Sequence, residues 1–206
     1  MGAQLRVFRR RIRSVQATKK ITKAMELIAS SRIVKAQQRL DASMPYLTQL
    51  VDAVSAAASH ASDVSKHPLT AKAAKQESAA ILVITADRGL AGAYSTNAIK
   101  EGEALTRNLS EKGMKVIPFV VGRKGVSYYR FRGRAMGGEY TGFTDQPTYA
   151  DAKRIGEDLL SAFHGDEAGA GGVDEIHVVY TQFVNMGTQE TRVRRILPLE
   201  VVDEVV

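Results

Sequence analysis

The fold is decided by the stretch Leu5-Arg6-Val7-Phe8-Arg9-Arg10-Arg11-Ile12-Arg13-Ser14-Val15, which opens a segment of helix-forming composition, residues 1–60. No glycine follows Gly2 in this segment, its single proline is Pro45, and Ala, Leu, Arg, Lys, Gln and Met dominate it. The composition predicts one helix of roughly 55 residues, about 80 Å long. Because Pro45 removes one backbone hydrogen bond, we expect it either to kink this helix or to split it.

A stripe of apolar residues runs along the predicted helix. Alternate steps of three and four residues from Leu5 give apolar side chains at both ends and polar ones in the middle. The apolar members are Leu5, Phe8, Ile12, Val15, Leu40, Leu47, Val51 and Val54. This spacing is typical of a coiled-coil seam.

A second apolar group lies beside the polar middle of that seam. Ile21, Met25 and Ile28 follow helical spacing but lie on nearly the opposite face. A helix whose apolar stripe changes side contacts two different neighbours along its length. The alternative for Met25 is a plain core filler, a common use of methionine.

Charge is concentrated at the N-terminus. The chain has a net charge of +7, yet residues 1–40 contain eleven basic residues and one acid, Glu26, so everything after them sums to −3. Arg6, Arg9, Arg10 and Arg13 share one helix face. This asymmetry indicates an acidic partner, which could be nucleic acid, an anionic membrane surface or an acidic protein surface. The alternative is that the basic face is simply exposed to solvent and binds nothing. A nucleic-acid backbone would need only the positive charges of this helix. The apolar group Ile21, Met25 and Ile28 therefore favours a protein that surrounds the helix as the partner.

The pattern changes after a polar, alanine-rich linker, residues 61–78. Short apolar runs that predict buried strands alternate with helical stretches, which indicates an α/β domain at 79–206 with a mainly parallel, Rossmann-like sheet. Pro118 indicates an edge position or a bulge in its strand. The predicted strands are 79–85, 116–121, 176–181 and, more weakly, 195–199; the predicted helices are 95–112, 123–132 and 149–163, with a surface loop at 165–172.

The loop after the first strand, Asp87-Arg88-Gly89-Leu90-Ala91-Gly92, is at the place where open α/β sheets bind ligands. Its glycine spacing matches neither a phosphate-binding loop nor a dinucleotide fingerprint, so we interpret Asp87, Arg88, Gly89 and Gly92 as a structural turn with salt-bridged side chains. An enzyme with a phosphate site in this loop is the weaker alternative.

No catalytic group, metal site or cofactor is expected. The chain has no cysteine, which excludes thiolate ligands and thiol nucleophiles. Its histidines lack the spacing of metal ligands, and His177, inside a strand, has a structural role by default. No run of apolar residues is long enough for a membrane span, so we expect a cytosolic chain or one attached to a membrane through partners.

Two blocks of sequence carry a family resemblance. The run from Lys19-Lys20-Ile21-Thr22-Lys23-Ala24-Met25-Glu26 to Arg32, preceded by Arg11-Ile12-Arg13-Ser14-Val15, resembles the gamma subunit family of ATP synthases, and so does the block Asp87–Asn97. The resemblance implies a non-catalytic rotor that couples proton flow to ATP synthesis. Its shaft would turn inside a ring of alpha and beta subunits, with the α/β domain beside the epsilon subunit and the membrane c-ring.

The resemblance also implies a location and a set of contacts. The location is the cytoplasmic face of a bacterial plasma membrane, without insertion. The contacts that we assign to acidic loops of the beta subunits are Arg9, Arg10, Lys20, Lys23 and Met25, with Ile21 and Ile28 beside them. A basic-helix protein that binds nucleic acid is the alternative function.

One departure from the family concerns the seam. Members of the family continue into a second long helix that pairs with the first, whereas this sequence stops at Val206. Seam residues such as Phe8 and Leu47 then lack an evident partner in the chain, and a long exposed apolar stripe is a liability for solubility. The expectation is a truncated product whose rotary coupling is doubtful.

Overall fold

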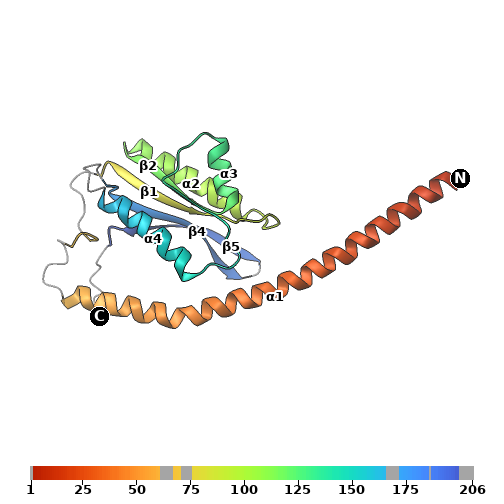
Figure 1. Cartoon of the computed structure of the whole chain (residues 1–206), viewed down its shortest axis with the longest axis horizontal. Coiled ribbons are helices and arrows are strands. Elements are labelled where there is room, and N and C mark those ends of the chain that lie inside the picture. Colours follow the sequence, from red (N-terminus) through yellow and green to blue (C-terminus); the bar gives the residue numbers. More distant parts are fainter. Residues whose placement is uncertain (1, 61–66, 71–75, 166–171, 186, 200–206) are drawn as a thin grey trace. The chain divides into compact units, whose positions relative to one another are not determined.

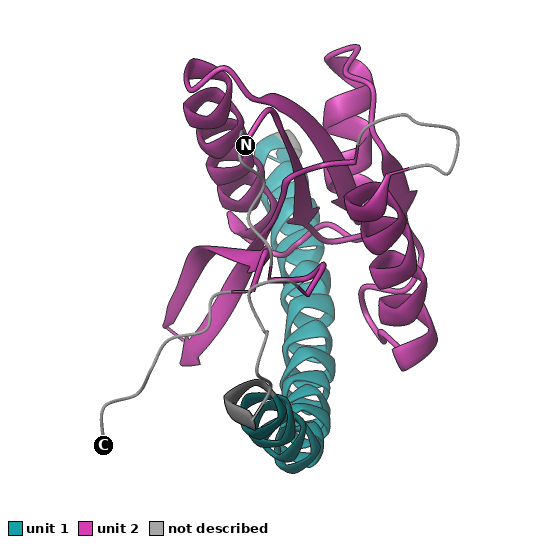
Figure 2. Cartoon of the chain, turned by 90° about the vertical axis from the view of Figure 1, so that its left-hand side faces the viewer, with its two compact units in different colours: residues 1–62 teal, residues 63–206 magenta. Residues whose placement is uncertain are grey.

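The computed structural model describes residues 2–60, 67–70, 76–165, 172–185 and 187–199. The chain divides into two compact units, Met1–Ser62 and Asp63–Val206, which Figure 2 colours separately. Most of the predicted linker and of the predicted loop at 165–172 lies outside the described residues. Each unit is described by itself.

The first unit is one helix, α1, from Gly2 to His60. Its 59 residues continue through Pro45 without a break, so the proline does not split the helix. Figure 1 shows α1 as a continuous, gently curved ribbon, as long helices commonly are. The predicted long helix is confirmed.

The second unit is built on a five-stranded sheet with the order β3-β2-β1-β4-β5. The first four strands in this order are parallel and β5 is antiparallel to β4, so the predicted mainly parallel α/β domain is confirmed. The strands are β1 Ser78–Ile84, β2 Lys115–Val121, β3 Gly138–Tyr140, β4 Glu175–Asn185 and β5 Thr188–Leu197. The strand β3 was not predicted from the sequence, and only the end of β5 was.

Helices cover both faces of this sheet, and each face has its own core. Alternate residues of β1 face opposite sides: Ile81 and Val83 pack with α2 (Tyr94–Glu111), whereas Leu82 packs with α4 (Tyr149–His164). The third helix, α3 (Arg123–Phe131), packs through Val126 and Tyr129 against Val120. Figure 1 shows α2 and α3 on one side of the sheet and α4 on the other.

Pro118 lies where β2 is locally an edge strand. Its carbonyl accepts the N–H of Gly137 at 2.8 Å, and pairing with β3 begins one residue later, at Phe119. The ring nitrogen of Pro118 therefore faces the β3 side, just before the β2–β3 pairing begins. The missing N–H costs the sheet no hydrogen bond there.

Part of the predicted linker belongs to the second unit. Leu69 packs against the core cluster on the α4 face, and its carbonyl accepts the N–H of Leu199 at 2.7 Å. The α/β unit therefore begins before the predicted boundary at residue 79.

Candidate partner-binding surface of helix α1

The first part of α1 is a cationic surface. Residues 2–25 contain five arginines and three lysines and no acid. The helix has no acidic residue in its first turn, where the helix dipole would favour one, so local helix stability does not explain this charge. The surface is therefore a candidate for contact with an acidic partner.

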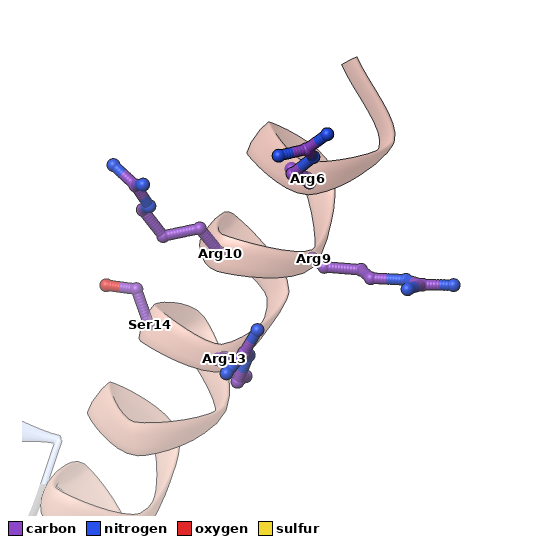
Figure 3. A pocket seen from close by; sticks show the side chains of 5 residues that line it. All are labelled: Arg6, Arg9, Arg10, Arg13 and Ser14. Atoms are coloured by element: carbon purple, nitrogen blue, oxygen red, sulfur yellow. The ribbon is translucent and has the colours of Figure 1, made fainter. Parts of the chain in front are cut away.

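Four arginines surround a shallow hollow on this surface, which Arg6, Arg9, Arg10, Arg13 and Ser14 line. Figure 3 shows that Arg9 and Arg10 extend toward opposite sides of the helix, so the guanidinium groups spread apart. Among the described residues, no carboxylate lies within ion-pair distance of these four groups. Because the guanidinium groups do not converge, they suit an extended acidic surface better than one small anion.

Our predicted contact set includes Arg9 and Arg10 but omits Arg6 and Arg13. The structure brings all four to the same hollow. Their shared helix face was already evident in the sequence, so the spacing could have added the two missing residues.

The second part of the predicted surface is apolar and cationic at once. Ile21, Met25 and Ile28 are 61%, 47% and 53% exposed, which is high for side chains of this kind. Lys23 forms an ion pair with Glu26 at 3.1 Å, one turn along the helix. Such an exposed pair contributes little stability. Within the part of the chain that the structure describes, no carboxylate lies within ion-pair distance of Lys20, which is beside the apolar group in sequence.

Hydroxyl groups near this surface are satisfied within the helix. Thr22 Oγ1 donates to the Thr18 carbonyl at 2.9 Å, and Ser30 Oγ donates to the Glu26 carbonyl at 2.9 Å. These bonds remove polar groups that a partner would otherwise have to satisfy. What remains for a partner is apolar area and positive charge.

The predicted seam is also exposed. Its eight members, Leu5, Phe8, Ile12, Val15, Leu40, Leu47, Val51 and Val54, are between 49% and 67% exposed. A single helix cannot bury such a stripe, because burial requires a second surface.

The loop after β1 has the geometry of a structural turn. The carboxylate of Asp87 accepts four hydrogen bonds, from the backbone N–H groups of Arg123, Gly142 and Thr144 and from the Thr144 hydroxyl, at 2.8–3.0 Å. Partial burial raises the pKa of Asp87, but these hydrogen bonds outweigh it and hold the pKa below its usual value. Arg88 pairs with Asp145 at 2.6 Å, so the two side chains have separate partners.

The same geometry disfavours a phosphate in this loop. The Asp87 carboxylate accepts the first N–H of α3, so an anion already occupies that helix N-terminus. Gly89 lies in the loop and Gly92 has a positive φ of 55°, which serves the turn. Among the described residues, no cluster of His, Asp or Glu is suited to a metal ion.

His177 has a partner inside the fold. Its Nε2 lies 2.8 Å from Glu175 Oε2, and Arg195 Nη1 lies 3.3 Å from the other oxygen of that carboxylate. These three residues come from β4 and β5, and no pattern in the sequence predicted their cluster. Across the described ranges, no helix has the length and apolar character to cross a lipid bilayer.

The fold and this surface define a class of protein. Its members have an α/β domain and, before it in the chain, a very long helix whose exposed surface is suited to contact with other proteins. A family model described as ATP synthase matches residues 4–205.

Curated relatives agree over nearly the whole chain. The ATP synthase gamma chain of Acidothermus cellulolyticus is 58% identical over 201 residues, which are 98% of this chain and 66% of the relative. That of Kineococcus radiotolerans is 57% identical over 205 residues, or 100% of this chain and 67% of the relative. The chain belongs to the ATP synthase gamma chain family, and it spans about two thirds of the length of these relatives.

A solved structure shares the fold. The central stalk and c-ring structure of the Tetrahymena thermophila mitochondrial ATP synthase matches with a TM-score of 0.62 at 21% identity, over 86% of this chain and 72% of that chain. At this identity the match supports the fold alone.

Proposed function

We propose that this chain is a central-stalk component of a proton-driven ATP synthase and couples rotation to conformational change at the catalytic beta subunits. Helix α1 would be the shaft, enclosed by alpha and beta subunits. The α/β unit would face the epsilon subunit and the membrane c-ring. The chain itself would be non-catalytic and peripheral, at the cytoplasmic face of a bacterial plasma membrane.

The observation that carries this proposal is the difference between the sides of α1. One side carries the apolar seam, and another carries exposed Ile21, Met25 and Ile28 close to Lys20 and Lys23. A nucleic acid would use the charges but not the exposed apolar side chains. A surrounding protein would use both.

Coupling requires such unlike sides. A shaft with identical faces contacts three equivalent subunits equally and shifts none of their conformational equilibria. A shaft with an apolar-cationic side stabilises the conformation of whichever subunit meets that side, so three sites can hold three conformations.

The test is assembly and turnover with alpha and beta subunits of a relative. The full chain and its double variant Lys20→Glu/Lys23→Glu are each mixed with these subunits, and complex formation and ATP hydrolysis are measured separately. Charge reversal should weaken assembly on the order of tenfold or more, because two attractive contacts become repulsive. The control is Lys100→Glu, on an exposed position of α2.

Two results would count against the proposal. One is equal assembly of the double variant and the control. The other is tight binding of mixed-sequence DNA by the full chain at physiological salt, with a steep salt dependence that Lys20→Glu/Lys23→Glu abolishes, since this would favour a nucleic-acid-binding protein.

A further inference from the structure

Helix α3 of the α/β unit carries a second cationic segment. Residues 123–134, which comprise the helix and the turn after it, contain five basic residues and no acid. Helix stability does not account for all of them, because Arg123 and Lys124 lie in the first turn, where the helix dipole disfavours positive charge. The segment is therefore a candidate for contact with a partner.

Three of the five basic residues pair with acids of neighbouring elements. The pairs are Arg123 with Asp87 at 3.9 Å, Arg134 with Glu103 at 2.7 Å, and Arg130 with Glu139. In the part of the chain that the structure describes, no carboxylate lies within ion-pair distance of the other two, Lys124 and Arg132. These two charges remain for a partner.

The two unpaired cations border an exposed aromatic side chain. The helix packs inward through Val126 and Tyr129. The residues on its opposite side and at its C-terminal end form what we call the α3 face, namely Lys124, Ser127, Tyr128, Phe131 and Arg132. Phe131 is 89% exposed, an unusual position for a phenylalanine that neither charge nor helix stability explains.

Arg132 is held in place on the α3 face. Its guanidinium carbon lies 5.7 Å from the centre of the Tyr128 ring, which is a cation–π arrangement. Tyr128 in turn packs edge-on against the buried Tyr129, with ring centroids 5.5 Å apart. A guanidinium group that lies over a ring keeps N–H groups at its edge for a carboxylate, so Arg132 is ordered before any partner arrives.

An aromatic side chain beside an ordered arginine is typical of the centre of a protein–protein interface. Such residues carry most of the binding energy when neighbouring contacts keep water away from them. On α3 the three ion pairs lie around the exposed Phe131 and can form this border.

From these contacts we infer that the α3 face docks an acidic segment of another protein. Phe131 packs against an apolar side chain of that segment, and Arg132 pairs with one of its carboxylates. The inference concerns the α/β unit and goes beyond the proposed function, which rests on the sides of α1.

The number of free charges favours a protein segment over other acidic partners. A nucleic acid or an anionic membrane gains affinity from many cations at once, and the α3 face offers two. A second copy of the chain is disfavoured, because a symmetric contact would bring the same cations together. An acidic protein segment needs few charges and also supplies an apolar contact for Phe131.

The probe is a display library of random short peptides, selected on the full chain and counter-selected on its Phe131→Ala variant. We expect enrichment of peptides in which acidic residues flank a large apolar one. Their dissociation constants should rise on the order of tenfold or more with Phe131→Ala, and several-fold with Arg132→Gln. Far-UV circular dichroism verifies that both variants keep the fold.

Three control variants should leave peptide binding unchanged. Tyr149→Ala removes another aromatic side chain, 81% exposed, from α4 on the other face of the sheet. Lys100→Glu changes an exposed charge on α2. Lys20→Glu/Lys23→Glu changes the surface that the proposed function uses, so the failure of one proposal is distinguishable from the failure of the other.

Three results would overturn the inference. The first is a selection that yields no peptide able to distinguish the full chain from Phe131→Ala. The second is a set of bound peptides without acidic residues, whose affinity Arg132→Gln does not change. The third is tighter, Phe131-dependent binding to phosphatidylglycerol vesicles or to mixed-sequence single-stranded DNA, which would make a membrane or a nucleic acid the partner of this face.

Discussion

The Asp87 carboxylate accepts the backbone N–H of Arg123 at 3.0 Å and so connects the loop after β1 to the first residue of α3. Two residues before Asp87 the same pattern occurs, because Thr85 Oγ1 accepts the N–H of Gly125 at 3.0 Å. Between them, the Ala86 carbonyl accepts the N–H of Lys124 at 3.1 Å. Three consecutive residues therefore satisfy the free N–H groups at the start of α3, which has no side-chain cap of its own.

Replacing Asp87 should destabilise the α/β unit and change its response to acid. Asp87→Asn removes a charge that several N–H groups share, and we expect a loss of about 1.5–3 kcal/mol at neutral pH. The folded-state pKa of Asp87 lies below its unfolded value, so the stabilisation is present above the unfolded pKa and is lost as the pH falls through the folded one.

The measurement is urea unfolding of both proteins between pH 7 and pH 3, followed by near-UV circular dichroism. The wild-type free energy of unfolding should fall more steeply than that of Asp87→Asn below about pH 4. Parallel curves would show that Asp87 is not a source of this pH dependence.

Gly122 should tolerate no side chain. Its φ is 91°, and a Cβ there would lie 2.3 Å from the carbonyl oxygen of Thr85, which is backbone and cannot rotate away. Gly122→Ala should lower the free energy of unfolding by at least about 2 kcal/mol, because alanine is strained at this φ and its methyl group would push the Thr85 carbonyl away.

Gly156→Ala is the matched control for Gly122→Ala. Gly156 lies inside α4, and its added methyl group would meet nothing within 4 Å. Alanine should therefore stabilise the unit by about 0.5–1 kcal/mol through helix propensity. Thermal unfolding should therefore give a lower midpoint for Gly122→Ala and a higher midpoint for Gly156→Ala than for wild type. A Gly122→Ala protein as stable as wild type would contradict the close contact with Thr85.

The start of α4 depends on a reciprocal cap. Thr148 Oγ1 accepts the N–H of Asp151 at 3.4 Å, while the Asp151 carboxylate accepts the Thr148 N–H at 2.9 Å. Thr148→Val keeps the shape but removes the acceptor, and should cost about 1 kcal/mol. The measurement is the urea midpoint at neutral pH, with Thr96→Val, an exposed position in the first turn of α2, as the control.

Elements with a strong local pattern could be predicted from the sequence, and those that depend on distant contacts could not. The apolar run of β1 and the unbroken helix formers of α1 each determine their own structure. The strand β3 has only three residues, Gly138–Tyr140, and no apolar run; most of β5 is polar because it is an edge strand.

The same distinction applies to the sites. The exposed positions of Ile21, Met25 and Ile28 follow from helical spacing alone, so the sequence could place them. The partners of Asp87 and Arg88, by contrast, lie at Arg123 and Asp145, far along the chain. No local pattern indicates such pairs, because the sheet order brings them together.

Pro45 should weaken α1 locally, although the helix continues through it. Without an N–H at residue 45, the carbonyl of Asp41 lacks its helical donor. The neighbouring Leu40 carbonyl accepts a hydrogen bond from Ser43 Oγ at 2.7 Å, and this bond does not supply the donor that the Asp41 carbonyl lacks. Pro45→Ala restores the missing donor and relieves the ring contact, so it should stabilise this turn by up to about 3 kcal/mol.

Hydrogen exchange of the full chain measures this effect. Amides within one turn of residue 45 should exchange more slowly in Pro45→Ala, while those near Met25 should not change. Ser43→Ala is the control, because it removes the local hydroxyl bond and leaves the proline in place, and it should slow exchange less than Pro45→Ala does. Unchanged exchange around residue 45 in Pro45→Ala would mean that the proline costs the helix nothing.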